Sequence, residues 1–262
     1  MSVLNYSLAD AVAVISLDRP EVLNSFDDEL GRATLAAVDR AAADDEVRCI
    51  VITGAGRAFS AGEDLGALVE GYERGEPPPL GDTLRDRYNP LIRSIRGAPK
   101  PVVAAINGVA AGAGASIALA CDFRIASEKA KLILAFIKVG LVPDSGGLWF
   151  LTKMVGAAKA WELGATGDPV SADEALRLGL VTKVVPADDF EHEWRNYSSA
   201  LAQGPTRAFA LTKQLVNSAT ERSLDEQLTF EIDAQSAAGQ SEDHLEGVNA
   251  FLAKRPPKFQ GR

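Results

Sequence analysis

The segment from Asn107 to Ser116, which reads NGVAAGAGAS, constrains the fold of this chain more than any other. It follows an apolar run at residues 101–106 that is typical of a strand, and it opens a second apolar run that is typical of a helix. Its small residues leave the backbone accessible, and the first N–H groups of a helix have no partner within the helix. Such N–H groups, here those of Gly112, Ala113 and Gly114, can donate hydrogen bonds to an anion at the positive end of the helix dipole.

A second corner of the same kind occurs earlier in the chain. Residues 59–65, with the sequence FSAGEDL, follow a predicted strand at residues 49–53 and precede a predicted helix. Either corner alone is better explained as a tight turn, whereas two corners with free amides can together form one oxyanion hole. The hypothesis of an oxyanion hole therefore depends on both corners being present in this order.

The composition limits the classes of partner. A chain of 262 residues with 47% hydrophobic residues is expected to form one large domain, or one domain with a small appendage. Its net charge of −9 argues against nucleic acid or an anionic membrane as a partner, so a ligand that bears phosphate needs a local basic patch. The N-terminus does not resemble a signal peptide, and the apolar run at 109–121 is too short to span a bilayer. These features predict a cytoplasmic protein.

The cysteines and histidines offer little chemistry. Cys49 and Cys121 lie in apolar contexts without metal-ligand spacing, which favours core packing, and no metal site is expected. His192 and His244 lie in charged helical stretches, which favours exposed positions on a helix surface.

The pattern of elements predicts an α/β fold. Strands are expected at 12–17, 49–53, 101–106, 121–126 and 131–135, and a helix that starts near Ser25 and Asp28 runs to about residue 43. A short helix to about residue 70 precedes a glycine- and proline-rich surface loop at 71–81, and residues 83–96 are helical around Pro90. After residue 145 helices dominate, interrupted by a strand at 180–185. The last four are expected to begin near Asp189, Pro205, Ser223 and Ser241, and to pack on the core or on a neighbouring subunit.

Five segments of the chain together resemble the crotonase superfamily of enoyl-CoA hydratases and isomerases. They are Arg19-Pro20 with Asn24, residues 59–65, residues 107–114, residues 140–147 (GLVPDSGG) and residues 251–256 (FLAKRP). Within the superfamily, the last three are most similar to the isomerases of phenylacetate degradation, which act on a ring-epoxide CoA thioester and its oxepin product. The resemblance implies a spiral of ββα units at 1–200 and a helical trimerisation region at 201–262. It also implies a trimer or a dimer of trimers, with a CoA thioester as substrate and no separate cofactor.

The family pattern assigns the two oxyanion donors to the backbone N–H groups of Glu63 and Ala113. A thioester whose α-carbon loses a proton becomes an enolate, and amides fixed in advance around its oxygen stabilise that charge. The side chain of Glu63 is expected to point to solvent, although it can also serve as a second acid or base.

Hydratases of this family add water with two glutamates, and the corresponding positions here are Ser116 and Phe136. Neither can act as a carboxylate base, so Asp144 remains as the candidate. One carboxylate can take a proton from one carbon and return it to another, which is all that an isomerase requires. Asp144 can alternatively cap a helix that begins near Ser145, and the two roles are compatible only if one carboxylate oxygen stays free.

The remaining contacts are also implied by the resemblance. It places the thioester against a set of residues around the two corners, namely Ala61, Gly62, Asp64, Leu65, Gly112, Gly114 and Phe136. It places CoA against Arg19 and, from a neighbouring subunit, Phe251 and Lys254. From the residues alone, Asp64 is a helix cap and Lys254 an exposed charge that complements a helix dipole.

The sequence therefore predicts an acyl-CoA isomerase, with an enoyl-CoA hydratase as the main alternative. Tyr72, Tyr88 and Phe136 suggest an apolar cavity of ring size. Two further alternatives are a serine hydrolase that uses Ser145, which lacks a convincing histidine base, and a CoA-binding protein without activity. A dinucleotide site is disfavoured because the glycine spacing does not fit.

Overall fold

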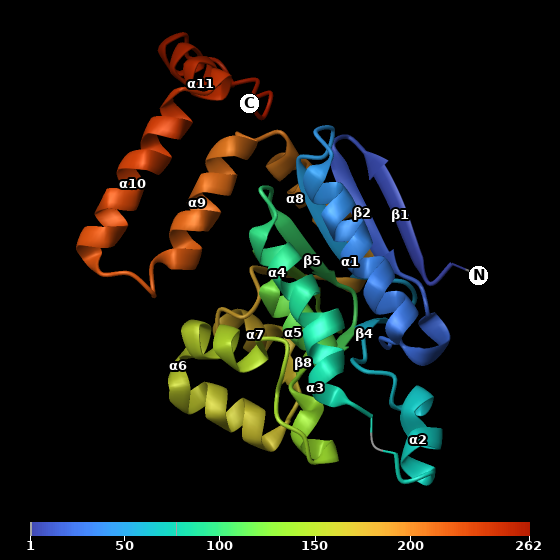
Figure 1. The fold of residues 1–262 in the computed structure, drawn as a ribbon. Helices are drawn as coiled ribbons and strands as arrows, with labels where there is room; N and C mark the ends of the chain where they lie inside the picture. Colours follow the sequence, from blue (N-terminus) through green and yellow to red (C-terminus); the bar gives the residue numbers. More distant parts are fainter. Residues whose placement is uncertain (1, 77) are drawn as a thin grey trace.

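The computed structural model describes residues 2–76 and 78–262, and the strands of this part of the chain form two sheets (Figure 1). The larger sheet has the strand order β1 (Leu4–Ala9), β2 (Val12–Leu17), β3 (Cys49–Gly54), β5 (Val102–Ile106), β7 (Phe123–Ser127) and β10 (Lys183–Val185). The smaller sheet has the order β4 (Ala58–Ser60), β6 (Val109–Ala111), β8 (Lys131–Ile133) and β9 (Val170–Ser171). Strands β1 and β9 pair antiparallel at the edges, and the other pairs are parallel.

From β3 to β8, each turn of the chain contributes one strand to each sheet. The pairs β3–β4, β5–β6 and β7–β8 are each followed by helical structure, which includes α4 (Asn89–Gly97), α5 (Ala113–Ala120) and α6 (Gly147–Thr166). This arrangement is the predicted spiral of ββα units. The strands of the smaller sheet have two or three residues each, too few to show a period, and the sequence predicted only β8 among them.

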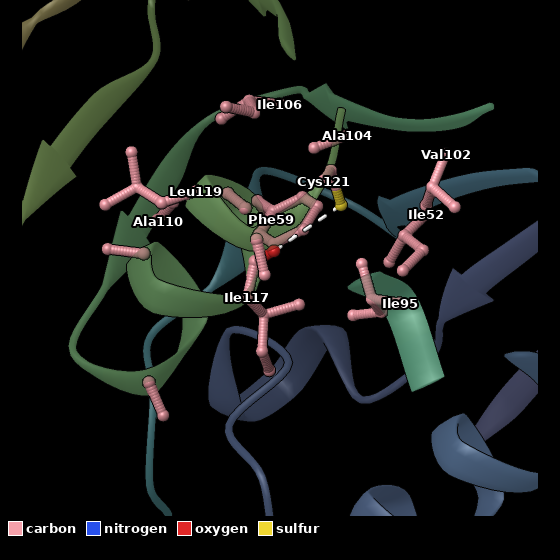
Figure 2. Packing of buried hydrophobic residues seen from close by; sticks show 14 of the residues in the cluster. Ile52, Phe59, Ile95, Val102, Ala104, Ile106, Ala110, Ile117, Leu119 and Cys121 are labelled. Atoms are coloured by element: carbon pink, nitrogen blue, oxygen red, sulfur yellow. Dashed lines mark hydrogen bonds between the residues drawn. The ribbon is translucent and has the colours of Figure 1, made fainter. Parts of the chain in front are cut away.

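Helices cover both faces of the larger sheet. On one face, α1 (Asp28–Ala43), α4 and α5 enclose the main core, and on the other α8 (Phe190–Ala202) packs with Phe190 and Trp194 over the sheet. Figure 2 shows part of the main core, in which Cys121 Sγ donates to the carbonyl of Ile117 at 3.4 Å. Burial raises the pKa of both Cys49 and Cys121 to about 12. The prediction that both cysteines serve core packing is confirmed.

Two predicted boundaries are wrong in detail. Helix α1 is capped by Asp27, whose side chain accepts from Leu30 N at 2.8 Å, and not by Ser25, because Ser25 donates instead to the carbonyl of Val22. The segment 71–81 is partly helical, since α2 (Val69–Glu73) enters it and α3 (Leu80–Thr83) begins directly after Pro79. Proline is compatible with the start of a helix, so Pro79 can directly precede α3. Residue 77 of this loop lies outside the described residues.

The four C-terminal helices are present as predicted. After α7 (Ala172–Arg177) and α8 come α9 (Thr206–Ser218), α10 (Leu224–Gly239) and α11 (Glu242–Leu252). Helix α10 begins with a capping box, in which Ser223 and Glu226 satisfy each other's backbone N–H groups. Figure 1 shows α9 and α10 side by side and α11 beyond them, all extending away from the sheets. In the part of the chain that is described, no helix is both long and apolar enough to cross a membrane.

A buried lysine joins α9 to the core. Lys213 Nζ donates to Asp122 Oδ2 at 2.8 Å and to the carbonyl of Ile95 at 2.9 Å, and Asp122 Oδ2 also accepts from Val102 N. We expect Lys213→Met to lower the free energy of unfolding by about 2 kcal/mol, because Asp122 loses its nearer cation and keeps only Arg96, at 3.7 Å, while the carbonyl of Ile95 loses a donor. Denaturant titration measures this loss. The exposed ion pair of Lys159 with Glu162 provides the control, since Lys159→Met should cost about 1 kcal/mol or less.

Candidate active site

The two glycine corners meet in space, as an oxyanion hole requires. Gly62 has φ +95°, and a Cβ built on it would lie 2.9 Å from the carbonyl oxygen of Ala111 and 3.3 Å from Ala113 N. Gly112 has φ +51° and stands at the N-cap of α5. Only glycine tolerates these conformations at such a close approach of two main chains.

The two predicted donor amides have no backbone acceptor, for a different reason in each case. Phe26 forms a parallel bridge with Glu63 by donating to Gly62 O and accepting from Asp64 N, so Glu63 N–H faces away from Phe26. Ala113 is the first residue of α5, where an N–H has no partner within the helix. Within residues 2–76 and 78–262, neither N–H is donated to a backbone carbonyl.

A cavity of about 230 Å³ lies against these two corners. Glu63, Ala113 and Asp144 line it together. Most of its other wall residues are apolar. The full set of these other residues is Ala61, Leu65, Leu68, Tyr72, Leu80, Thr83, Leu84, Tyr88, Gly112, Ala135, Phe136, Val139, Leu141 and Val142. The three aromatic residues that suggested a ring-sized cavity are all among them. The cavity thus has largely apolar walls and brings the carboxylate of Asp144 together with the two residues that carry the predicted donor amides.

Asp144 lies in the loop between the 3₁₀-helix Ala135–Val139 and α6, and its side chain does not cap α6. The N-cap of that helix is Gly146, with φ +76°, so the interpretation of Asp144 as a cap at Ser145 is wrong. One carboxylate oxygen, Oδ1, accepts from Ser145 Oγ at 2.8 Å, and the main-chain oxygen accepts from Ser116 Oγ at 3.0 Å. The second oxygen, Oδ2, has no hydrogen-bond partner among the described residues, so it is available to a ligand.

The surroundings of Asp144 make it a better proton acceptor than an exposed aspartate. Burial raises the pKa of Asp144, and the negative charge of Glu63 raises it further. The hydrogen bond from Ser145 and the positive charge of Arg87 lower the pKa in part, yet the net shift is upward. A general base is most effective when its pKa approaches the working pH.

The side chain of Glu63 does not point to solvent, which corrects the expectation from the sequence. Arg87 Nη2 donates to both of its carboxylate oxygens, at 2.6 Å to Oε1, and the Tyr88 hydroxyl donates to Oε2. Arg87 is only 7% exposed. The prediction of one regular helix over residues 83–96 does not reveal Arg87, because Leu84–Tyr88 forms a π-helical turn that changes which side chains face inward.

The other positions around the corners have mainly packing roles. Neither hydratase position holds a carboxylate, since one is Ser116, which is fully buried, and the other is Phe136, which lines the cavity and is 8% exposed. At Gly114 an added Cβ would lie 2.7 Å from Ser60 Cβ, which explains the glycine by packing. Asp64 Oδ2 pairs with Arg19 Nη2 at 2.9 Å.

The residues expected to bind CoA are not gathered in one copy of the chain. Arg19 is held by Asp27 at 3.1 Å and by Asp64, close to the first corner. Phe251 is 82% exposed on α11, and Lys254 follows that helix. In Figure 1, α11 and the cavity-lining helices α2 and α3 lie at opposite ends of the molecule.

The histidines lie where the sequence placed them. His192 and His244 are exposed on α8 and α11, and His192 contacts Asn196. The hydroxyl of Ser145 donates to Asp144, an arrangement without the histidine base that a serine hydrolase needs. Among the residues that the structure describes, no three His, Cys, Asp or Glu side chains are grouped so as to hold a metal ion.

Comparisons with known proteins agree with this geometry. The chain matches the enoyl-CoA hydratase/isomerase family over residues 7–262. It is 45% identical to a probable enoyl-CoA hydratase of Rhodobacter capsulatus, over 99% of this chain and 98% of that protein. It is 44% identical to the 1,2-epoxyphenylacetyl-CoA isomerase of Escherichia coli, over 96% of this chain and 95% of that protein.

The fold also matches solved structures. An enoyl-CoA hydratase/isomerase homologue from Mycobacterium abscessus superposes with a TM-score of 0.94 at 39% identity, over 99% of this chain and 100% of the other. The family match spans nearly the whole chain, and the relatives share its full length. The chain therefore belongs to the crotonase superfamily, as an enzyme of the enoyl-CoA hydratase/isomerase family.

Proposed function

We propose that this enzyme is an acyl-CoA isomerase in which Asp144 carries a proton between two carbons of the acyl group. The supporting observation is the cavity that Asp144 lines together with Glu63 and Ala113, the residues that carry the two predicted donor amides. Asp144 presents a free carboxylate oxygen there, whereas Glu63 is engaged by Arg87 and Tyr88. One free carboxylate beside an oxyanion hole fits a proton transfer between carbons better than the addition of water.

The simplest reaction is the conversion of a 3-enoyl-CoA to a 2-enoyl-CoA. Asp144 removes a proton from C2, and the electrons of that C–H bond form a dienolate whose oxygen accepts hydrogen bonds from Glu63 N–H and Ala113 N–H. The double bond then lies between C2 and C3 when Asp144 returns its proton to C4. No atom is gained or lost, and the carboxylate ends ionised as it began.

A ring-epoxide phenylacetyl-CoA is a second substrate class for the same site, with oxepin-CoA as the product. The Escherichia coli relative named for this epoxide supports it, as do the aromatic walls formed by Tyr72, Tyr88 and Phe136. Hydration of a 2-enoyl-CoA remains the alternative, because the Rhodobacter capsulatus relative is named a hydratase. The absence of carboxylates at Ser116 and Phe136 argues against hydration.

The test is to supply purified enzyme with three thioesters in parallel. They are a 3-enoyl-CoA, a 2-enoyl-CoA and 1,2-epoxyphenylacetyl-CoA, with products separated by liquid chromatography and identified by mass. We expect isomeric products of unchanged mass from the first or the third. Conversion of the 2-enoyl-CoA to a 3-hydroxyacyl-CoA at a higher kcat/KM than either isomerisation would show that the enzyme is a hydratase.

We also propose that the C-terminal helices join copies of the chain into a trimer or a dimer of trimers. Large apolar side chains are exposed along α10 and α11, namely Leu224, Leu228, Ile232, Leu245, Val248, Phe251 and Leu252. A trimer would also allow the contact of Lys254 with the CoA of a neighbouring copy that the family resemblance implies. Light scattering should give three or six times the 27.7 kDa mass of one chain, and Ile232→Glu should lower that mass. A monomeric wild-type protein would contradict the proposal.

A further inference from the structure

An ionic cluster around buried Arg87 adjoins the cavity, and the reaction described above does not use its side chains. Arg87 Nη2 contacts both oxygens of Glu63, Tyr88 donates to Glu63 Oε2, and Arg87 Nη1 reaches Asp28 Oδ1 at 3.1 Å. Glu63 and Tyr88 both line the cavity together with Asp144. Glu63 keeps 23% of its side chain exposed, while Tyr88 is 3% exposed.

The main chain is distorted where this cluster forms. In the π-helical turn Leu84–Tyr88, Asn89 N–H donates to Leu84 O, five residues back, so that Arg87 and Tyr88 both face inward. Burial, followed by the charge of Glu63, raises the pKa of the Tyr88 phenol well above its usual value, which keeps its proton available for donation to Glu63. The turn thus aims two donors at a single carboxylate.

The room for Arg87 comes from a glycine on a different helix. Gly31 lies in α1, outside the cavity lining, and a Cβ built on it would be 2.4 Å from Arg87 Cδ and 2.6 Å from Arg87 Cγ. Alanine normally strengthens the interior of a helix relative to glycine. At position 31 it would instead push the arginine stem, so the position of Arg87 depends on Gly31.

We propose that Arg87 and Tyr88 form a clamp that fixes Glu63 in place, holding its backbone N–H on the substrate oxygen and its negative charge beside Asp144. In this proposal, which rests on the proposed function, Arg87 is a positioning residue and Gly31 provides the space it needs. Glu63 is the residue that carries the predicted first oxyanion donor, so whatever fixes its side chain also limits the movement of its amide.

The clamp also sets the electrostatic field at Asp144. The charged and titratable groups that act on Asp144 are Glu63, Arg87 and Tyr88, together with the hydroxyl of its neighbour Ser145. Loss of the Glu63 charge should lower the pKa of Asp144, and loss of the Arg87 charge should raise it. The reaction needs ionised Asp144, so kcat falls at low pH, and we call this fall the acid limb of the kcat profile. Loss of the Glu63 charge should move the acid limb to lower pH, and loss of the Arg87 charge should move it to higher pH.

The experiment compares the full-length wild type with Glu63→Gln, Arg87→Met and Gly31→Ala. The first measurement is the absorption shift of bound 2,4-hexadienoyl-CoA, a conjugated thioester whose spectrum moves to the red when amides polarise its carbonyl. The second is the dependence of kcat and KM for a 3-enoyl-CoA on pH. Arg85→Met is the matched control, because Arg85 lies in the same π-helical turn but is 70% exposed and pairs with exposed Asp82.

We expect Arg87→Met and Gly31→Ala to reduce the absorption shift and to lower kcat by about 10- to 100-fold, with KM changed less than about threefold. Glu63→Gln keeps one acceptor oxygen for Arg87 and Tyr88, so it should reduce the absorption shift less than Arg87→Met does, and it should move the acid limb of kcat to lower pH. Arg85→Met should behave as wild type. Gly31→Ala and Glu63→Gln retain the arginine. If Arg87→Met does not fold, the absorption shift and kcat of these two variants test the clamp.

Variants at positions 31, 63 and 87 that keep the wild-type absorption shift, kcat and acid limb would overturn the clamp. A wild type that polarises hexadienoyl-CoA but leaves 3-enoyl-CoA unchanged would instead overturn isomerisation of that substrate. The absorption shift in the variants would then still decide whether the clamp exists. A wild type that gives no absorption shift would overturn the clamp itself.

Discussion

Asp144→Asn should lower kcat for isomerisation by a factor of about 10³, within the range of about 10² to 10⁴ that a positioned general base contributes. The amide of asparagine keeps the shape of the side chain but cannot accept the C2 proton. The oxyanion donors at Glu63 and Ala113 are unchanged, so binding of acyl-CoA, measured by calorimetry, should stay within about threefold of wild type. An Asp144→Asn enzyme of wild-type kcat would show that another group moves the proton.

Ser145→Ala is the control for this variant. It removes the hydroxyl that bonds to Asp144 Oδ1 but leaves the carboxylate, so turnover should be largely retained. Because the Ser145 hydroxyl lowers the pKa of Asp144, its removal should move the acid limb of kcat to higher pH. Complete loss of activity in a folded Ser145→Ala protein would instead favour a nucleophilic serine.

Asp144→Asn should also change the dependence of stability on pH. Asp144 has a higher pKa in the folded protein than in the unfolded chain, so the unfolded chain ionises first as pH rises and the folded state loses stability between the two pKa values. Asparagine removes this loss. The variant should therefore melt at a higher temperature than wild type at neutral pH, and the difference should vanish at pH values below the unfolded-state pKa.

Ala113→Pro should lower kcat by about 10² to 10³, because it removes one of the two N–H groups predicted to bind the enolate oxygen. Ala113 is the first residue of α5, a position where proline fits the helix and where no backbone hydrogen bond is lost. The substitution thus deletes a donor with little effect expected on the fold. Steady-state kinetics measure the loss, and thermal unfolding verifies that α5 is intact.

Ala113→Ser is the matched control, since serine keeps the N–H and adds only a hydroxyl to the cavity wall. We expect it to retain far more activity than Ala113→Pro. The oxyanion assignment would be contradicted if the proline variant folded and kept a kcat within about threefold of wild type.

Much of the architecture was predictable because its signals are local. The runs at 12–17 and 49–53 are apolar enough to be recognised as strands, and Ser223 and Ser241 mark helix starts through their own side chains. The paired corners were recognisable for the same reason, since glycine at 62 and 112 satisfies a requirement of the local backbone. The buried cysteines and exposed histidines also followed from the residues next to them.

The prediction for Glu63 was wrong because its partners are distant in sequence. Nothing near Glu63 in the chain shows that Arg87 and Tyr88 will meet it, and these two face inward only through a π-helical turn that periodicity cannot reveal. The same limit applies to Gly31, whose packing against Arg87 joins two helices.

The sequence by itself determined an α/β core and the two glycine corners, because small residues and apolar periods act over a few residues. Its resemblance to a known family supplied the ββα spiral and Asp144 as the candidate base. Only the tertiary structure decided which groups share the cavity and where Glu63 points. Those properties depend on contacts between residues as distant in the chain as Glu63 and Tyr88, or Glu63 and Asp144, for which no local pattern exists. Short motifs thus identify the residues that carry the chemistry, and the packing of distant segments sets the charges around them.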